Sequence, residues 1–131
     1  MKIRSDFVTN SSSSSYIIRT KEELEEKKHS IIKITKENVV SVISNMFVFY
    51  TLSPNYDNET IKKMFNLSEE QFLLLRLMDN SFLGFGIEEY IEIKKALDRE
   101  GYIYYIGSED YYNNNNLDSI VKRSEEVLYE N

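Results

Sequence analysis

The chain has 131 residues, which suits a single domain with one hydrophobic core. Its content of 41% hydrophobic and 13% aromatic residues excludes an intrinsically disordered chain, and the absence of cysteine excludes a disulfide framework and every thiolate metal site. The formal net charge of -6 is unevenly spread, since residues 1–66 hold 10 basic and 8 acidic side chains and residues 67–131 hold 6 and 14.

The first predicted strand follows a run of five serines. Tyr16 to Arg19 combines β-branched and aromatic residues, which favour a pleated, half-buried surface. Thr20 then stands three residues before a glutamate, as in a capping box, so a short polar helix is expected over about 21–28. The apolar residues at 30–34 predict a brief strand or a buried connector.

Three helices are expected in the middle of the chain. The first should run from Lys36 to about Thr51, and the second should start at Asp57 or Asn58. A capping box at 68–71 opens the third. Because residues 72–78 are apolar nearly all round, this helix is predicted to be the central buried one, with Leu74 or Leu75 fully buried.

The last third of the chain begins after a break at 84–86. An amphipathic helix is expected over 87–97, ended by Gly101, and Tyr102 to Ile106 gives the strongest strand signal in the protein. A polar loop should occupy 107–116. A final helix is expected, with an apolar face made of Leu117, Ile120, Val121, Ser124 and Leu128.

The two strong strand signals lie far apart in the sequence. Because an isolated strand leaves its backbone groups unsatisfied, Tyr16 to Arg19 and Tyr102 to Ile106 are expected to pair in one small sheet. Several helices should pack on one face of that sheet. The sequence therefore predicts an α+β fold and a single domain over residues 1–131.

The opening residues, KIRSDFVTNSSSSSY, form a distinctive pattern. The serine run reads as a loop, or as an edge strand whose polar side resists aggregation. The stretch also resembles the opening K-x-R-x-x-F-V-S/T-N-S-S-S-S-S-F/Y of many small uncharacterised bacterial and phage proteins. The resemblance covers about the first 16 residues and implies a source, not a reaction. It suggests a recognition tag read by a modifying or processing enzyme, made of Lys2, Arg4, Phe7, Asn10, Ser11, Ser12, Ser13, Ser14, Ser15 and Tyr16.

No residue pattern predicts catalysis, a metal or a cofactor. His29 is the only histidine, and a lone histidine near the C-terminal end of a predicted helix is most simply a partner of the helix dipole. Acidic pairs such as Glu69-Glu70 and Glu88-Glu89 fall in predicted first turns, where carboxylates stabilise a helix. The sequence therefore predicts a protein that is not an enzyme, with no metal and no cofactor.

The stretch "GYIYYIGSEDYYNNNN", residues 101–116, predicts a recognition surface. Tyrosine and asparagine supply rigid contact area with polar tips. The candidate interaction residues are Tyr102, Tyr104, Tyr105, Glu109, Asp110, Tyr111 and Tyr112. The alternative is a strand packed on helices followed by a polar loop. Because this half of the chain is acidic, we expect a protein partner with a basic surface and no direct binding to nucleic acid, although the same charge would also serve solubility alone.

Neither an apolar signal segment nor an apolar run long enough to span a bilayer is present, so a cytoplasmic location and no membrane contact are expected. The leading hypothesis is a non-enzymatic, acidic interaction protein of phage or mobile-element origin. Its sharpest form is an inhibitor of a host nucleic-acid-handling protein. The alternative is a protein whose serine-rich N-terminal tag is modified or processed by another enzyme. The sequence leaves the oligomeric state open.

Overall fold

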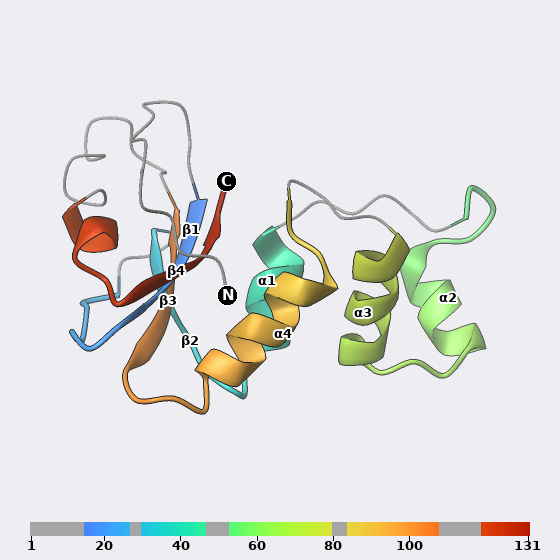
Figure 1. The fold of residues 1–131 in the computed structure, drawn as a ribbon. Coiled ribbons are helices and arrows are strands. Elements are labelled where there is room, and N and C mark those ends of the chain that lie inside the picture. The colour runs from blue at the N-terminus through green and yellow to red at the C-terminus, as the bar shows by residue number, and fades with distance from the viewer. Residues whose placement is uncertain (1–14, 27–29, 47–52, 80–83, 108–118) are drawn as a thin grey trace. The chain divides into compact units, whose positions relative to one another are not determined.

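The computed structural model describes residues 15–26, 30–46, 53–79, 84–107 and 119–131 (Figure 1). The chain divides into two compact units. The sheet unit comprises residues 1–36 and 88–131, and the helical unit comprises residues 37–87. The prediction that residues 1–131 fold as one domain stays a prediction, because compactness alone does not say whether the units fold independently.

The sheet unit contains four antiparallel strands in the order β2-β3-β1-β4. Their bounds are Ser15–Thr20 for β1, Ile31–Ile34 for β2, Tyr102–Gly107 for β3 and Glu126–Glu130 for β4. Central β1 pairs with β3 on one side and β4 on the other, and Ile18 lies opposite Tyr104. The α+β class and the pairing of the two strongest strand signals are therefore confirmed.

One face of the sheet carries the main apolar cluster of this unit. Alternate residues of β1 and β3 point to this face, since side chains alternate along a strand. They pack against the segment that follows β1 and against a helical turn at 119–122. The buried members of the cluster are Tyr16, Ile18, Leu24, Ile31, Tyr104, Ile106 and Val121.

Helix α4, Ile87–Ala96, covers the opposite face of the sheet. Its buried apolar residues Tyr90, Ile93 and Ala96 fall three residues apart, so they form one stripe along the helix. Glu89 of α4 acts electrostatically on Tyr129, which is paired with Ile17 on this second face. In Figure 1, α4 and the 119–122 turn lie on opposite sides of the sheet. Helical segments thus cover both faces, whereas the sequence suggested one.

The prediction of a short helix over 21–28 is wrong for the described residues 21–26, which are irregular. The Thr20 hydroxyl accepts a hydrogen bond from the Glu22 amide at 3.2 Å, two residues on, which is a local turn and not a helix cap. The Leu24 amide donates to the Tyr104 hydroxyl at 2.9 Å. This long-range bond holds the segment across the sheet and overrides the capping signal.

The prediction of a C-terminal helix is also wrong. Only the turn at 119–122 is helical in the described part, and Leu128 lies buried in β4 instead of on a helix face. The segment forms a strand because β1, paired with β3 on one side, has backbone groups on its other side that need partners. The Glu125 amide donates to the Arg19 carbonyl at 2.8 Å, and the Asn131 amide donates to the Ser15 carbonyl at 2.9 Å.

The helical unit follows the local signals closely. It contains α1, Val39–Met46, α2, Asn58–Met64, and α3, Glu69–Asp79. The Asp57 carboxylate accepts from the Thr60 amide at 2.7 Å and caps α2. Ser68 and Gln71 form a reciprocal capping box, with amide-to-side-chain distances of 2.9 and 3.1 Å. The expected continuation of the first helix to Thr51 lies outside the described residues.

Burial on α3 differs from the expectation. Leu73 and Leu77 are the buried leucines, whereas Leu74 is half-buried and Leu75 is 39% exposed. The prediction that Leu74 or Leu75 is fully buried, and that this helix is buried all round, is therefore wrong. Leu73 and Leu77 are four residues apart, so α3 buries one stripe and presents its other side to solvent.

Candidate functional site

Three strands meet at one end of the sheet. Ser15 starts β1, and it lies opposite Gly107, the last residue of β3. The Asn131 amide donates to the Ser15 carbonyl at 2.9 Å, and the Ser15 amide donates to the Asn131 carbonyl at 3.4 Å. The serine run is joined to the sheet at Ser15, and the segment that begins at residue 108 is joined to it at Gly107. The two distinctive stretches of the sequence are therefore attached at neighbouring positions.

Hydroxyl groups gather near this end of the sheet. The Ser15 and Tyr105 hydroxyl oxygens are 3.4 Å apart, a distance at which either can donate. Burial raises the pKa of Tyr129 to about 12, and the neighbouring Tyr105 and Glu89 act in the same direction. Because Tyr129 stays protonated at neutral pH, its hydroxyl keeps its capacity to donate a hydrogen bond.

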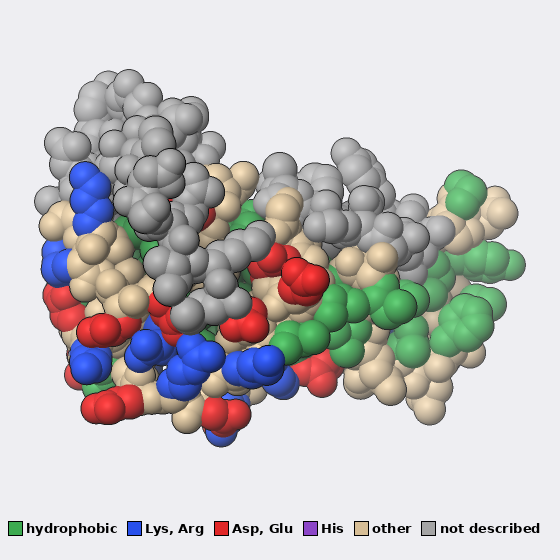
Figure 2. All heavy atoms as spheres, in the orientation of Figure 1, with side chains coloured by type: hydrophobic (Ala, Val, Ile, Leu, Met, Phe, Trp, Pro, Cys, Tyr) green, Lys and Arg blue, Asp and Glu red, His purple; other side chains and the backbone are tan. Residues whose placement is uncertain are grey.

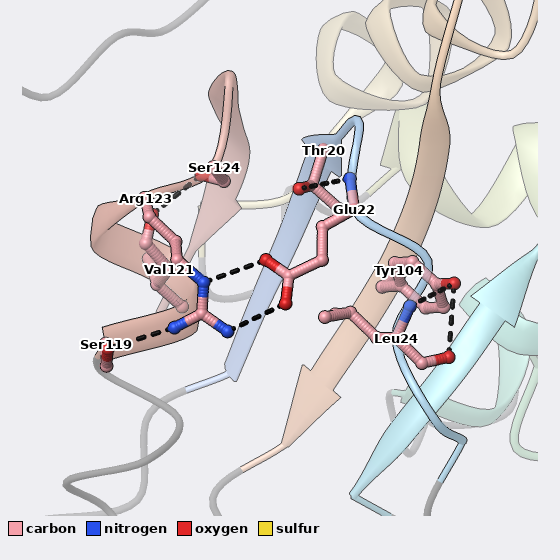
Figure 3. A network of polar contacts seen from close by, with 8 residues as sticks. All are labelled: Thr20, Glu22, Leu24, Tyr104, Ser119, Val121, Arg123 and Ser124. Atoms are coloured by element: carbon pink, nitrogen blue, oxygen red, sulfur yellow. Dashed lines mark hydrogen bonds and ion pairs between the residues drawn. The ribbon is translucent and has the colours of Figure 1, made fainter.

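The tyrosines of β3 divide between the core and the surface. Tyr104 is fully buried, and its hydroxyl accepts from the Leu24 amide at 2.9 Å and donates to the Leu24 carbonyl at 3.3 Å (Figure 3). Burial raises the pKa of Tyr104. Tyr102 and Tyr105 are half-buried, and the Lys33 ammonium lies 4.7 Å from the centre of the Tyr102 ring. Tyr102 and Tyr105 can therefore offer part of their surface to a partner, whereas Tyr104 has a structural role.

The other predicted interaction residues, Glu109, Asp110, Tyr111 and Tyr112, lie outside the described residues. The same holds for most of the predicted tag, namely Lys2, Arg4, Phe7, Asn10, Ser11, Ser12, Ser13 and Ser14. The last two tag residues open β1, where Ser15 is half-buried and Tyr16 is 2% exposed. Tyr16 thus anchors the end of the serine run in the core.

Ion pairs take up several acidic side chains of the sheet unit. Arg123 donates to both Glu22 oxygens at 2.8 and 2.9 Å, and also to the Ser119 hydroxyl at 3.0 Å (Figure 3). The hydrogen bond from Arg123 lowers the pKa of Glu22. This fork-to-fork pair ties the segment after β1 to the 119–122 turn.

A second set of ion pairs is more buried. One oxygen of Glu126, whose side chain is 3% exposed, accepts from Arg19 and from Arg99 at 2.8 Å each. On the face seen in Figure 2, acidic and basic side chains are interspersed over this unit. The acidic excess of the chain is therefore not gathered into one uniform patch on the visible described surface.

Sequence reasoning missed an apolar surface on the helical unit. Five of the six large hydrophobic side chains exposed in the described part of the chain belong to this unit: Tyr56, Met64, Phe65, Leu75 and Met78. A usable signal exists in the sequence. Residues 71, 75 and 78 share one side of α3 and carry no charge, which is unusual for a side of a helix that faces water.

No protein-family model, curated protein or solved structure matches this chain. Within the described ranges, no three histidine, cysteine or acidic side chains come together as a metal site would require. No helix in the described part of the chain is long and apolar enough to cross a membrane.

Proposed function

We propose that the protein is a non-enzymatic interaction protein of the cytoplasm, and that it binds a protein partner at the end of the sheet where β1 starts. The observation that carries this proposal is the pairing of Ser15 with both Gly107 and Asn131. It brings the attachment points of the serine run and of the tyrosine- and asparagine-rich segment to adjacent strands, about 5 Å apart. A partner could contact both at once.

The chemistry of the segment suggests the kind of partner. Glu109 and Asp110 stand beside Tyr111 and Tyr112 in the sequence, so carboxylates and aromatic rings are available together. Tyrosine gives much contact area for a small loss of conformational freedom, and carboxylates favour a basic partner. Inhibition of a host nucleic-acid-handling protein is the sharpest form of this proposal, because such a protein presents a basic surface that expects phosphates.

Affinity capture of the full chain from its host, with partners quantified by mass spectrometry, tests the proposal. Replacing Glu109 and Asp110 by Gln and Asn, together with Tyr111→Ser and Tyr112→Ser, should abolish recovery of the specific partner. The matched control replaces Glu88 by Gln and Tyr56 by Ser, which are exposed on helix α4 and in the helical unit. Equal recovery with both sets of variants would contradict the proposal.

The second candidate, a tag that another enzyme modifies or processes, has one supporting observation. Ser15 and Tyr16 are fixed in β1, so the rest of the serine run leaves from a defined point of the sheet. The intact mass of the protein from its native host tests this candidate. A mass shift that disappears when Ser11 to Ser14 are replaced by alanine supports it, and an unmodified mass counts against it.

A further inference from the structure

The outer edge of β2, on the side away from β3, ends the described sheet. The Gly107 amide donates to the Ser30 carbonyl at 2.8 Å, and Ile31 lies opposite Ile106. In an antiparallel ladder, residues that bond to the neighbouring strand alternate with residues whose backbone groups point away from it. Since Ser30 bonds to β3, Ile31 and Lys33 direct their amides and carbonyls to the outer edge.

A side chain takes the place of a further strand at this edge. The Glu26 carboxylate accepts a hydrogen bond from the Lys33 amide at 2.8 Å. In a wider sheet, a carbonyl of the next strand would accept from that amide. A strand that pairs with β2 therefore has to displace this exposed carboxylate.

The segment before Glu26 is fixed by long-range contacts. The Leu24 amide donates to the Tyr104 hydroxyl at 2.9 Å, and the Leu24 side chain belongs to the main apolar cluster (Figure 3). Both carboxylate oxygens of Glu22 accept from Arg123. Because these contacts hold the chain close to Glu26, the carboxylate loses less conformational freedom when it binds the edge of β2.

The sequence of β2 is that of a strand that pairs readily. Ile31–Ile34 consists of three isoleucines and one lysine, and its register with β3 runs without a shift. Edge strands are ordinarily protected by charged side chains or by bulges. The Lys33 ammonium lies 4.7 Å from the centre of the Tyr102 ring, so this charge is held over the face of the sheet and not at its edge.

The strand at the opposite end of the described sheet, β4, is irregular. Ile17 of β1 pairs with Tyr129 and Ile18 pairs with Val127, so Leu128 is an extra residue in β4. Such a bulge bends and twists a strand, which disfavours pairing with another chain. The regular strand β2 has instead the carboxylate of Glu26 at its edge.

We propose that Glu26 blocks the outer edge of β2, and that without it this edge pairs with the same edge of a second copy of the chain. A two-fold antiparallel pairing can place Ile31 of one copy opposite Lys33 of the other. Each Ile31 carbonyl then accepts from the Lys33 amide that Glu26 now binds. The two lysines do not lie opposite each other, so the pairing avoids a direct contact of like charges. This inference does not rest on the function proposed above.

Sedimentation velocity of the full chain tests the association. A contact between two short strands should be weak, with a dissociation constant on the order of 100 µM, so concentrations from about 5 to about 500 µM are needed. Glu26→Ala should shift from monomer towards dimer across this range, beyond any association of the wild type. Glu26→Gln keeps an oxygen that accepts from the amide, so it should sediment as the wild type does. Glu25→Ala is the matched control, because it removes the neighbouring exposed glutamate and changes the net charge equally.

Amide hydrogen exchange of Lys33 tests the position of the contact. At the lowest concentration, the Lys33 amide should exchange at least about fivefold faster in Glu26→Ala than in the wild type, because a hydrogen bond to a charged acceptor is lost. At the highest concentration, pairing between copies should slow this exchange again. Glu26→Gln should stay close to the wild type throughout.

The proposal is overturned if Glu26→Ala sediments as the wild type does at every concentration, or if Glu25→Ala or Glu26→Gln associates as strongly as Glu26→Ala. Association that leaves the exchange of the Lys33 amide unchanged would place the contact elsewhere and would overturn it too. Circular dichroism melts check the fold of each variant. An unfolded Glu26→Ala chain would also contradict the proposal, because the carboxylate would then be needed for the fold itself.

Discussion

The sheet unit and the helical unit are stabilised in different ways. In the sheet unit, β1 pairs with strands about a hundred residues later, both sheet faces are covered, and charged groups such as Glu126 are buried with partners. In the helical unit, caps and turns within a few residues build α2 and α3, and one side of α3 remains apolar and exposed. From this comparison we expect the sheet unit to depend on its long-range contacts, whereas exposed side chains of α3 such as Leu75 and Met78 should be replaceable without loss of the fold.

The largest expected effect contrasts a core residue with a surface residue. Ile18→Ala should lower the free energy of unfolding by about 2–5 kcal/mol, because Ile18 is fully buried in the sheet. Leu75→Ala should cost less than about 1 kcal/mol, because Leu75 is 39% exposed. Urea denaturation measures both values. Similar costs for the two variants would remove the distinction between the units.

A buried carboxylate should matter more than an exposed one. Glu126→Gln leaves Arg19 and Arg99 without their shared negative charge, and should cost about 2–3 kcal/mol since Glu126 is 5% exposed. Glu22→Gln, which weakens the exposed pair with Arg123, should have a clearly smaller effect, because solvent screens that pair. The same denaturation experiment at low and high salt checks the pair of values, and only the Glu22 effect should shrink clearly with salt.

Alkaline pH should weaken the sheet unit through Tyr129. The folded pKa of about 12 lies above the ordinary value of 10.0, so folding favours the protonated hydroxyl. The resulting stability is fully present below pH 10 and is lost as the pH rises through 12, with a total of up to about 2–3 kcal/mol. Stability measured against pH for the wild type and for Tyr129→Phe checks this. The fall between pH 10 and 12 should be smaller in the variant, and parallel curves would contradict the assignment.

Two glycines with positive φ allow the cost of backbone strain to be compared with the cost of steric crowding. Gly101 has φ +106°, and a Cβ there would lie 2.8 Å from the Thr20 carbonyl oxygen, whereas Gly84 has φ +76° and open space. Gly101→Ala should therefore cost about 2 kcal/mol and Gly84→Ala about 1 kcal/mol. Thermal melts can compare them. An equal cost would mean that the close approach to β1 relaxes freely.

Local signals in the sequence predicted the helical unit better than the sheet unit. The caps at Asp57 and Ser68 were predictable because their partners lie three residues away. The strand β4 was mistaken for a helix because its partner, β1, lies far away in the sequence. Thr20 was likewise mistaken for a helix cap, since the bond that fixes the next segment comes from Tyr104.

The candidate site could be predicted only in part. The sequence singled out the tyrosines of β3, but Tyr104 is buried and bonded to Leu24, whereas Tyr102 on the same face and Tyr105 on the other face are half-buried. The meeting of Ser15, Gly107 and Asn131 depends on strand register, which no local pattern encodes. The exposed apolar side of α3 has a signal in the uncharged positions 71, 75 and 78, but which side of the helix is buried depends on tertiary packing.

The position of β1 has a consequence for synthesis on the ribosome. The ion pair between Arg19 and Glu126 can form only after Glu126, 107 residues later in the chain, has been synthesised. At about 5–20 residues per second, several seconds pass between the emergence of β1 and that of its last partner. During that interval Tyr16, Ile17 and Ile18 lack their final neighbours, while α2 and α3 can close from local contacts. Chaperones would therefore be most needed during this interval, while the sheet unit is incomplete.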